Sequence, residues 1–233
     1  DIISRPRDIS FDPESSVVYL VLEDGTLSCL TTYRTEAVTA WCKLNTAGKF
    51  ISAAVIGDNI YFCVERKNGW FIEKFVDDYY SDCSLRLTSE TPQRGWSGLE
   101  HLEGEEVVVL ANGFSLGKFK VEEGEIHLLD EADEIIVGLP YEHLIEPLPY
   151  MVEAERPYSP KALRVIGARF RILDSKSFCI DIGSGYFHYP LKRIHRDKIF
   201  DSPPLTYSGD VQMRALGWIR EMNKPMWSIK SAE

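Results

Sequence analysis

Short runs of alternating apolar and polar residues follow one another along the first third of the chain. They are separated by turns rich in Gly, Asn and Asp, the residues that tolerate tight reversals of the backbone. Strands at such regular, short intervals predict an antiparallel all-β unit. The runs cover residues 16–23, 26–33, 38–44, 50–56, 59–66 and 70–76.

The first two runs belong to the stretch "VVYLVLEDGTLSCLTTYR". An Asp-Gly pair between two strands is typical of a hairpin with a type I′ turn, in which both central residues have positive φ angles. We therefore predict such a turn at Asp24-Gly25. Trp41 and Trp70 lie inside later strand patterns, and we expect both indole rings to pack in the core.

The rest of the chain divides into three stretches. Residues 77–98 are polar and rich in turn residues, and we interpret them as a connection. In residues 99–141, strands separated by "ANG" and "EEG" predict a small β-barrel of about five or six strands. The segment "IEPLPYMVEAERPYSP" contains four prolines, which argues against a helix there. Strand patterns resume from residue 161.

The expected fold is therefore mainly β, with few helices. Antiparallel sheets form a propeller-like or sandwich part, into which a small β-barrel is inserted. We expect three domains, at residues 1–98, 99–141 and 142–233, of which the last is either separate or completes the first unit.

Composition and charge argue against two classes of function, nucleic-acid binding and membrane spanning. The 233 residues carry a net charge of −10, which disfavours nucleic-acid binding over a broad face. A local basic patch at residues 190–198 is the best exception, and a solvated loop is the preferred interpretation of it. No apolar run of about 18 residues predicts a membrane span. The chain begins without Met or a signal peptide, so we expect a piece of a longer polypeptide.

Cysteine usage indicates a reducing, intracellular environment. The number of cysteines is odd, their spacing is wide, and no CxxC motif occurs. Most lie in apolar runs, where cysteine behaves as a small hydrophobic residue. We predict no metal site and no cofactor. The cysteines are Cys29, Cys42, Cys63, Cys83 and Cys179.

Catalytic patterns are weak. "GFSLG" fits the GxSxG motif with Ser115 as nucleophile, but the residues after it continue as a strand rather than as the required helix. None of the five histidines stands in an HxH or HExxH pair, and the acidic clusters fall at turns. We predict no enzyme. Two aromatic clusters are candidates for contact with a partner or a glycan, and their residues are Tyr79, Tyr80, Tyr186, Phe187 and Tyr189.

The pattern between residues 16 and 141 resembles the tail nozzle, or tail tubular, structural proteins of short-tailed phages and prophages. It consists of a strand, a DG turn, "LTTY", "E.V.AW", a strand ending in "V.R", and "IE" followed by a basic residue. The later "LEGEEVVVLANG" and "IIVGLPY" resemble the small barrel of the same proteins, which is similar in shape to the first catalytic cysteine half-domain of ubiquitin-activating enzymes. The matching positions in the first part are Asp24, Gly25, Leu27, Leu30, Thr31, Thr32, Tyr33, Glu36, Val38, Ala40, Trp41, Gly48, Ser52, Val55, Ile56, Val64, Arg66, Ile72 and Glu73.

This resemblance implies a non-enzymatic virion protein made in the bacterial host cytoplasm. It would form a homo-oligomeric ring in the virion, bind other tail or connector proteins, and let DNA pass without specific binding. An isolated fragment can remain monomeric, because ring contacts often need the missing parts and the neighbouring tail proteins. A shared barrel shape carries no activity with it. Two alternatives stay open: a glycan- or receptor-binding tail module, and a polysaccharide-degrading tail enzyme.

Overall fold

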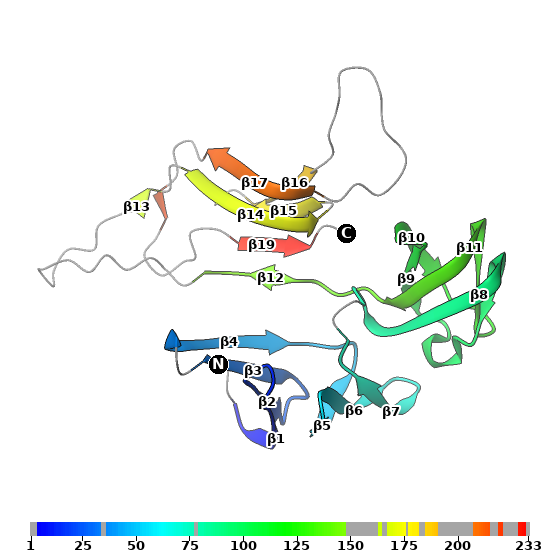
Figure 1. The fold of residues 1–233 in the computed structure, drawn as a ribbon, viewed down its shortest axis with the longest axis horizontal. Helices are drawn as coiled ribbons and strands as arrows, with labels where there is room; N and C mark the ends of the chain where they lie inside the picture. Colours follow the sequence, from blue (N-terminus) through cyan, green and yellow to red (C-terminus); the bar gives the residue numbers. More distant parts are fainter. Residues whose placement is uncertain are drawn as a thin grey trace, which may run out of the picture. The chain divides into compact units, whose positions relative to one another are not determined.

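The chain is mainly β, as the sequence predicts, and all its sheets are antiparallel (Figure 1). The computed structural model describes residues 4–33, 36–76, 79–147, 163–164, 167–175, 177–181, 185–190, 207–214, 219–220 and 228–231. These residues contain no α-helix. The chain divides into two compact units, Asp1–Tyr141 and Glu142–Glu233. The first two predicted domains both fall in the first unit.

Two sheets of the first unit are built from short consecutive strands. Six of the strands lie within two residues of the predicted ranges, whereas β1 was not predicted. The sequence pattern does not predict β1, because most of its side chains are exposed and its first residue is a proline. The first sheet has the order β1 (Pro6–Asp12), β2 (Val17–Leu22), β3 (Leu27–Tyr33), β4 (Val38–Leu44), and the second has the order β5 (Lys49–Ile56), β6 (Asn59–Arg66), β7 (Gly69–Lys74).

The two sheets share one hydrophobic core. Alternate side chains of β6 point into it, as the period of two in a strand requires. The Phe62 ring packs edge-on against Tyr19 at 5.9 Å and against Phe50 at 5.2 Å between ring centroids. Full burial of a Val, Leu, Ile or Phe side chain contributes about 1.5–3 kcal/mol to the stability of the folded state. The buried members are Tyr19, Val21, Leu27, Cys29, Ile60, Phe62 and Val64.

The Asp24-Gly25 turn joins β2 and β3, but the predicted type I′ geometry is wrong. Gly25 has a φ of +84°, whereas Asp24 is not among the residues with positive φ. The Gly25 N–H donates to the Leu22 carbonyl at 3.0 Å, and the Leu22 N–H donates to the Thr26 carbonyl at 2.9 Å. This is a three-residue loop that ends in a left-handed glycine. The Asp24 carboxylate explains the difference, because it accepts hydrogen bonds from the Thr26 N–H at 2.9 Å and hydroxyl at 2.6 Å.

We expect Gly25→Ala to destabilise the first unit by about 2–3 kcal/mol. The new Cβ would lie 2.6 Å from both Cβ and Cγ of Lys49, and the φ of +84° disfavours any side chain. Gly113→Ala is the matched control, because Gly113 has a φ of +79° and a Cβ there meets nothing within 4 Å. Urea denaturation of both variants measures the difference. Equal losses would show that crowding against Lys49 is unimportant.

The third sheet of the first unit corrects the predicted connection at residues 77–98. Most of that segment is β8 (Asp82–Ser97), and the sheet has the order β10-β9-β11-β8. The residues of β8 are mostly polar and exposed, so the strand lacks the apolar alternation that would predict it. The other strands are β9 (Glu106–Ala111), β10 (Phe114–Lys120) and β11 (Glu125–Leu139), and a short 3-10 turn, η2 (Glu100–Leu102), precedes β9.

The two long strands of this sheet bend over a second hydrophobic core. The register between β11 and β8 jumps between His127 and Ala132, opposite Gly95 and Gln93. Both halves of the bent pair contribute buried side chains. The described pairings do not include a ladder between β10 and β8, so the predicted barrel is not confirmed. The core residues are Trp96, Leu99, Leu102, Val107, Val109, Ala111, Val121, Ile126, Leu128, Ala132, Ile135, Val137 and Leu139.

The second unit consists of smaller sheets. One has the order β12-β19-β15-β16, and two pairs are β13–β18 and β14–β17. Phe178 on β15 is buried and packs edge-on against Phe170 on β14 at 6.3 Å, which joins two of these sheets. The strands are β12 (Leu144–Ile145), β13 (Leu163–Arg164), β14 (Gly167–Ser175), β15 (Ser177–Asp181), β16 (Tyr186–Pro190), β17 (Tyr207–Arg214), β18 (Ile219–Arg220) and β19 (Ser228–Ser231).

Candidate functional site

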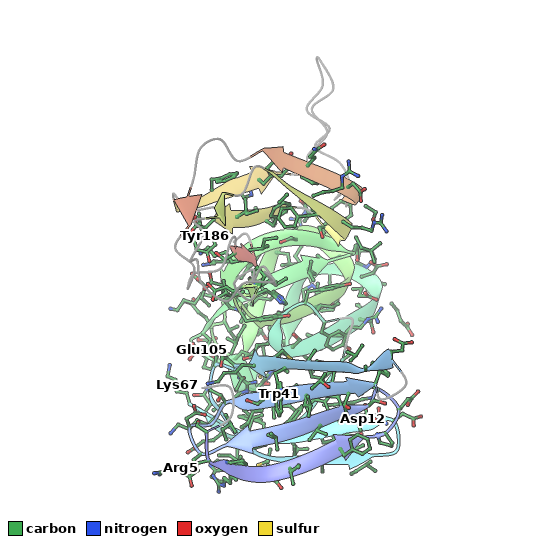
Figure 2. All side chains as sticks on the ribbon, turned by 90° about the vertical axis from the view of Figure 1, so that its left-hand side faces the viewer. Arg5, Asp12, Trp41, Lys67, Glu105 and Tyr186 are labelled. Carbon is green, nitrogen blue, oxygen red and sulfur yellow. The ribbon has the colours of Figure 1, made fainter. Side chains whose placement is uncertain are left out.

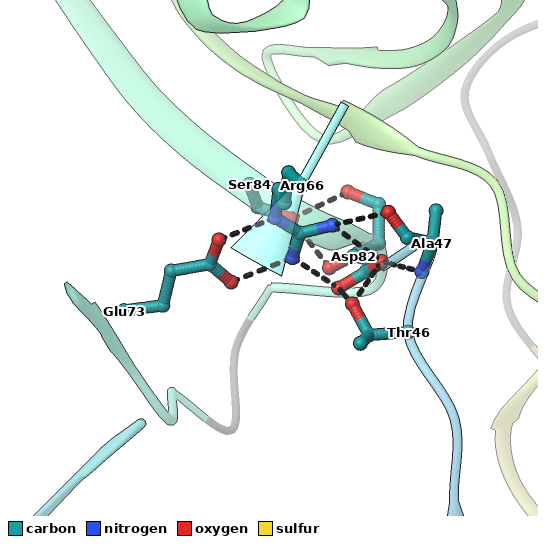
Figure 3. A network of polar contacts seen from close by, with 7 residues as sticks. Thr46, Ala47, Arg66, Glu73, Asp82 and Ser84 are labelled. Carbon is teal, nitrogen blue, oxygen red and sulfur yellow. Dashed lines mark hydrogen bonds and ion pairs between the residues drawn. The ribbon is translucent and has the colours of Figure 1, made fainter. Parts of the chain in front are cut away.

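The most elaborate polar arrangement of the first unit surrounds Arg66, the last residue of β6 (Figure 3). Its side chain is buried between two carboxylates. Nε and Nη2 donate to the two oxygens of Glu73 on β7, and Nη2 donates at 2.6 Å. On the other side, Nη2 donates to Asp82 Oδ1 at 3.0 Å and Nη1 to Asp82 Oδ2 at 3.2 Å. The guanidinium thus holds both acids in fork geometry.

Asp82, the first residue of β8, extends this network to the connection between β4 and β5. Its Oδ2 accepts the Ala47 N–H at 2.9 Å and the Thr46 hydroxyl at 2.8 Å. The Ala47 carbonyl in turn accepts from Arg66 Nη1 at 3.3 Å. We call these five residues the Arg66 network, and it connects four segments of the first unit.

The charges in the Arg66 network compensate one another. Burial lowers the pKa of Arg66, but the hydrogen bonds that Arg66 donates to Glu73 and Asp82 outweigh this effect and raise the pKa above its ordinary value. Burial also raises the pKa of Asp82, while the hydrogen bond from Arg66 and those from Ala47 and Thr46 bring it below its usual range. Both groups are therefore charged at neutral pH. The arrangement is suited to holding strands together rather than to transferring protons.

The family resemblance included Arg66 and Glu73, but the sequence did not predict their ion pair or the part played by Asp82, although one signal for a buried arginine was present. Buried and half-buried side chains alternate along β6, and the buried ones begin with Ile60, Phe62 and Val64. Arg66 is the next residue in this series, so the period of two places it on the buried face. A buried arginine requires acidic partners. Which acids serve cannot be inferred from spacing, because Glu73 and Asp82 lie 7 and 16 residues away.

Lys67, at the tip of the β6–β7 hairpin, lies beside Glu105, a residue that follows η2 (Figure 2). Lys67 Nζ lies 2.9 Å from Glu105 Oε1, and Asn68 Nδ2 donates to the His101 carbonyl at 3.4 Å. The Phe71 ring meets the His101 imidazole edge-on, with 6.5 Å between centroids. Burial lowers the pKa of His101, so its ring is neutral at pH 7. These contacts favour a packing role for His101.

The predicted contact residues belong to two different units. Tyr79 and Tyr80 lie in the first unit, between β7 and β8, where Tyr79 is half-buried and Tyr80 is 72% exposed. Tyr186, Phe187 and Tyr189 lie on β16 of the second unit. The sequence offered no means of assigning the five side chains to one surface.

On β16 the three aromatic residues have different surroundings. The Tyr186 hydroxyl lies 2.9 Å from Ser228 Oγ, and Lys230 Nζ lies 5.0 Å from the centre of the Tyr186 ring. Tyr186 is 43% and Phe187 38% exposed. Tyr189 stacks on the buried Phe178 at 5.4 Å. Tyr186 and Phe187 can therefore contact a ligand with part of their rings, while Tyr189 supports the core.

Other sequence candidates are distributed as follows. Ser115 is the second residue of β10, which follows the two-residue turn at Asn112-Gly113, and the chain continues as the expected strand. Trp70 is 63% exposed on β7, so the predicted core packing of this residue is wrong. Its strand is at the edge of a sheet, and its side chain points to the solvent face. Residues 191–198 of the basic segment and His195 lie outside the described residues.

Described residues include no group of three or more His, Cys, Asp or Glu side chains able to hold a metal ion. Cys29 and Cys42 face each other across β3 and β4. Cys29 is buried and Cys42 is exposed. Burial, followed by the neighbouring Cys42, raises the pKa of Cys29 to about 12, and burial raises that of Cys83 to about 12 as well.

We expect iodoacetamide at pH 8 to modify Cys42 well before Cys29 and Cys83. The thiolate is the reactive form, and a pKa of about 12 leaves very little of it at that pH. Peptide mass spectrometry over a time course gives the order of modification. Cys42→Ser, the control, should remove the earliest adduct without exposing Cys29. Early modification of Cys29 in the folded protein would contradict its burial.

Comparison with known proteins gives no relative from which to transfer a function. No family model matches the chain. No curated protein matches it either. Within the described residues, no helix has the length and apolar character needed to cross a membrane. Fold and site together define an antiparallel β protein whose principal buried polar network connects strands.

Proposed function

We propose that the chain is a non-enzymatic structural protein of a phage or prophage virion, located in the tail nozzle or head–tail connection. The observation that carries this proposal is the Arg66 network. A buried arginine that binds two carboxylates and links four segments stiffens a wall of strands. Such stiffness suits a tube that withstands internal pressure.

Positions that carry the family resemblance contribute to this network. Arg66 ends the "V.R" strand and Glu73 is the acid of the "IE" motif, and the two side chains form an ion pair. The DG turn of the motif is also present, with Gly25 at its left-handed position. Two separated parts of the motif therefore meet in space, which supports the view that the pattern encodes a common scaffold.

The acidic composition fits the passage of DNA. A net charge of −10 repels the phosphate backbone and disfavours adhesion of DNA to the wall. The partners in this proposal are further tail or connector proteins and other copies of the chain in a ring.

Localisation in particles tests the proposal. An antibody against the chain would be applied to purified particles from an induced culture of the source bacterium and imaged by electron microscopy. We expect gold label at the tail, close to the head. Particles that carry tails but contain no trace of the chain by mass spectrometry would overturn the proposal.

The exposed rings of Tyr186 and Phe187 favour a second candidate, a glycan- or receptor-binding tail module. An exposed aromatic ring beside a lysine offers an apolar platform with an adjacent donor, a combination that suits a sugar. A glycan array with the wild-type chain and with Tyr186→Ala, which removes the ring beside Lys230, tests this candidate. Binding that disappears in the variant would support it, while an array without signal would remove it.

A further inference from the structure

Strand β7 forms one edge of the β5-β6-β7 sheet and carries large apolar side chains on its solvent face. Trp70 is 63% and Ile72 is 81% exposed. Soluble proteins usually protect such an edge with charges, prolines or bulges, because unpaired strands recruit other strands. On the exposed face of β7 the only charged side chain is Lys74.

The backbone of β7 offers hydrogen-bonding groups at this edge. In an antiparallel ladder, alternate residues exchange hydrogen bonds with the partner strand. The Phe75 N–H donates to the Ile60 carbonyl at 2.9 Å, so Phe75 belongs to a hydrogen-bonded pair with β6. Such pairs alternate along the ladder, so Phe71 and Glu73 also bond to β6. Trp70, Ile72 and Lys74 consequently direct their N–H and C=O groups away from β6. Among the described residues, none makes a backbone hydrogen bond to these groups.

Part of the sheet face beside this edge is also apolar. Ile72 lies opposite Cys63 on β6, and Tyr61 lies opposite Ala54 on β5. Ile56, at the end of β5, is 65% exposed. The face also carries Glu65, which lies opposite Trp70. A strand added to β7 would therefore extend a face that is apolar around Ile72.

We propose that β7 pairs antiparallel with β7 of a second copy of the chain, about a two-fold axis at Ile72. In this register Trp70 lies opposite Lys74 of the partner subunit, and the reciprocal pair forms on the other side of the axis. Each ammonium group meets an indole ring, the strongest aromatic partner for a cation. No like charges face each other on this side of the sheet. The outward N–H and C=O groups of the three residues find partners in both copies.

The self-complementary sequence of β7 favours a second copy over an unrelated peptide. Reading "WFIEK" against itself in antiparallel order places Trp opposite Lys and Ile opposite Ile. An isologous interface requires this property, because the same patch serves both subunits. The inference does not depend on the proposed function, since it uses only the edge strand and its register.

Light scattering coupled to gel filtration, over about a hundredfold range of concentration, tests the proposal. We expect the wild-type mass to rise from 26.6 kDa towards twice that value as the concentration increases. Ile72→Lys places two ammonium groups on the axis and should weaken the dimer about tenfold or more. Ile56→Lys, the matched control, adds the same charge on the same sheet but away from β7 and should leave dimerisation unchanged. Circular dichroism verifies that both variants are folded.

A wild-type chain that stays monomeric at every concentration would overturn the proposal. An equal loss of dimer in both variants would also overturn it, because the sheet face rather than the β7 edge would then form the contact. A folded Ile72→Lys variant that dimerises like the wild type would exclude β7 from the interface.

Discussion

Replacing Arg66 by methionine is expected to lower the free energy of unfolding of the first unit by about 3–5 kcal/mol. The substitution leaves Glu73 and Asp82 partly buried without their shared counter-charge. Arg86→Met is the surface control, because the Arg86–Glu134 pair is largely exposed and exposed pairs contribute about 0–1 kcal/mol. Urea denaturation at neutral pH compares the two variants. Similar, small losses would show that the Arg66 network contributes little stability.

The pH dependence of the same variant gives a second signature. In the wild-type chain the pKa of Asp82 is lowered on folding, so its contribution to stability is present at neutral pH and is lost as the pH falls through the folded value. Without Arg66, only the hydrogen bonds from Ala47 and Thr46 oppose the effect of burial, so the pKa of Asp82 should rise from its wild-type value. Arg66→Met should therefore lose less stability than the wild type as the pH falls through the titration range of Asp82. Parallel pH profiles would contradict this explanation.

Truncating Trp96 to alanine should cost about 3–5 kcal/mol, because its side chain fills the core of the third sheet. Trp96→Phe should cost much less than Trp96→Ala. The indole Nε1 is buried, and no hydrogen-bond partner for it is found among the described residues. Phenylalanine keeps most of the apolar contact and removes an unpaired N–H, whose burial costs about 1–3 kcal/mol.

Thermal and urea denaturation of the two Trp96 variants provide the comparison. Near-ultraviolet circular dichroism checks that the phenylalanine variant retains a packed core. If phenylalanine were as harmful as alanine, the indole N–H would have a partner that stabilises it, and the core would have to be re-examined around that atom.

The sequence predicted the consecutive strands of the first unit well because two local signals agreed there. Alternation along β6 was regular, and turn residues bounded that strand on both sides. It missed β1 and most of β8, because an exposed strand lacks the apolar period that identifies it. Trp70 was placed in the core for a related reason. Alternation distinguishes the two faces of a strand, but it does not say which face is covered.

The candidate sites depended on information that sequence alone does not contain. Arg66 and Asp82 come together only because β6 and the beginning of β8 are adjacent in the fold. Similarly, neighbouring aromatic residues on β16 have different surroundings, since Tyr189 stacks on a residue of β15. Local composition indicated which residues were unusual, and tertiary packing determined their neighbours.

The pairing of Asp82 with Leu139 has an architectural consequence. The chain enters this sheet at Asp82, the start of β8, and leaves it at Leu139, the end of β11. Because these two residues are paired across the ladder, the entry and exit points lie side by side, and we call this pair the neck. Loops and strands beyond a neck of this kind can be lengthened, shortened or exchanged without altering the spacing of the flanking segments. A splice at the neck that preserves Asp82 would retain the anchoring acid of Arg66, so this sheet is a natural location for grafting a foreign module.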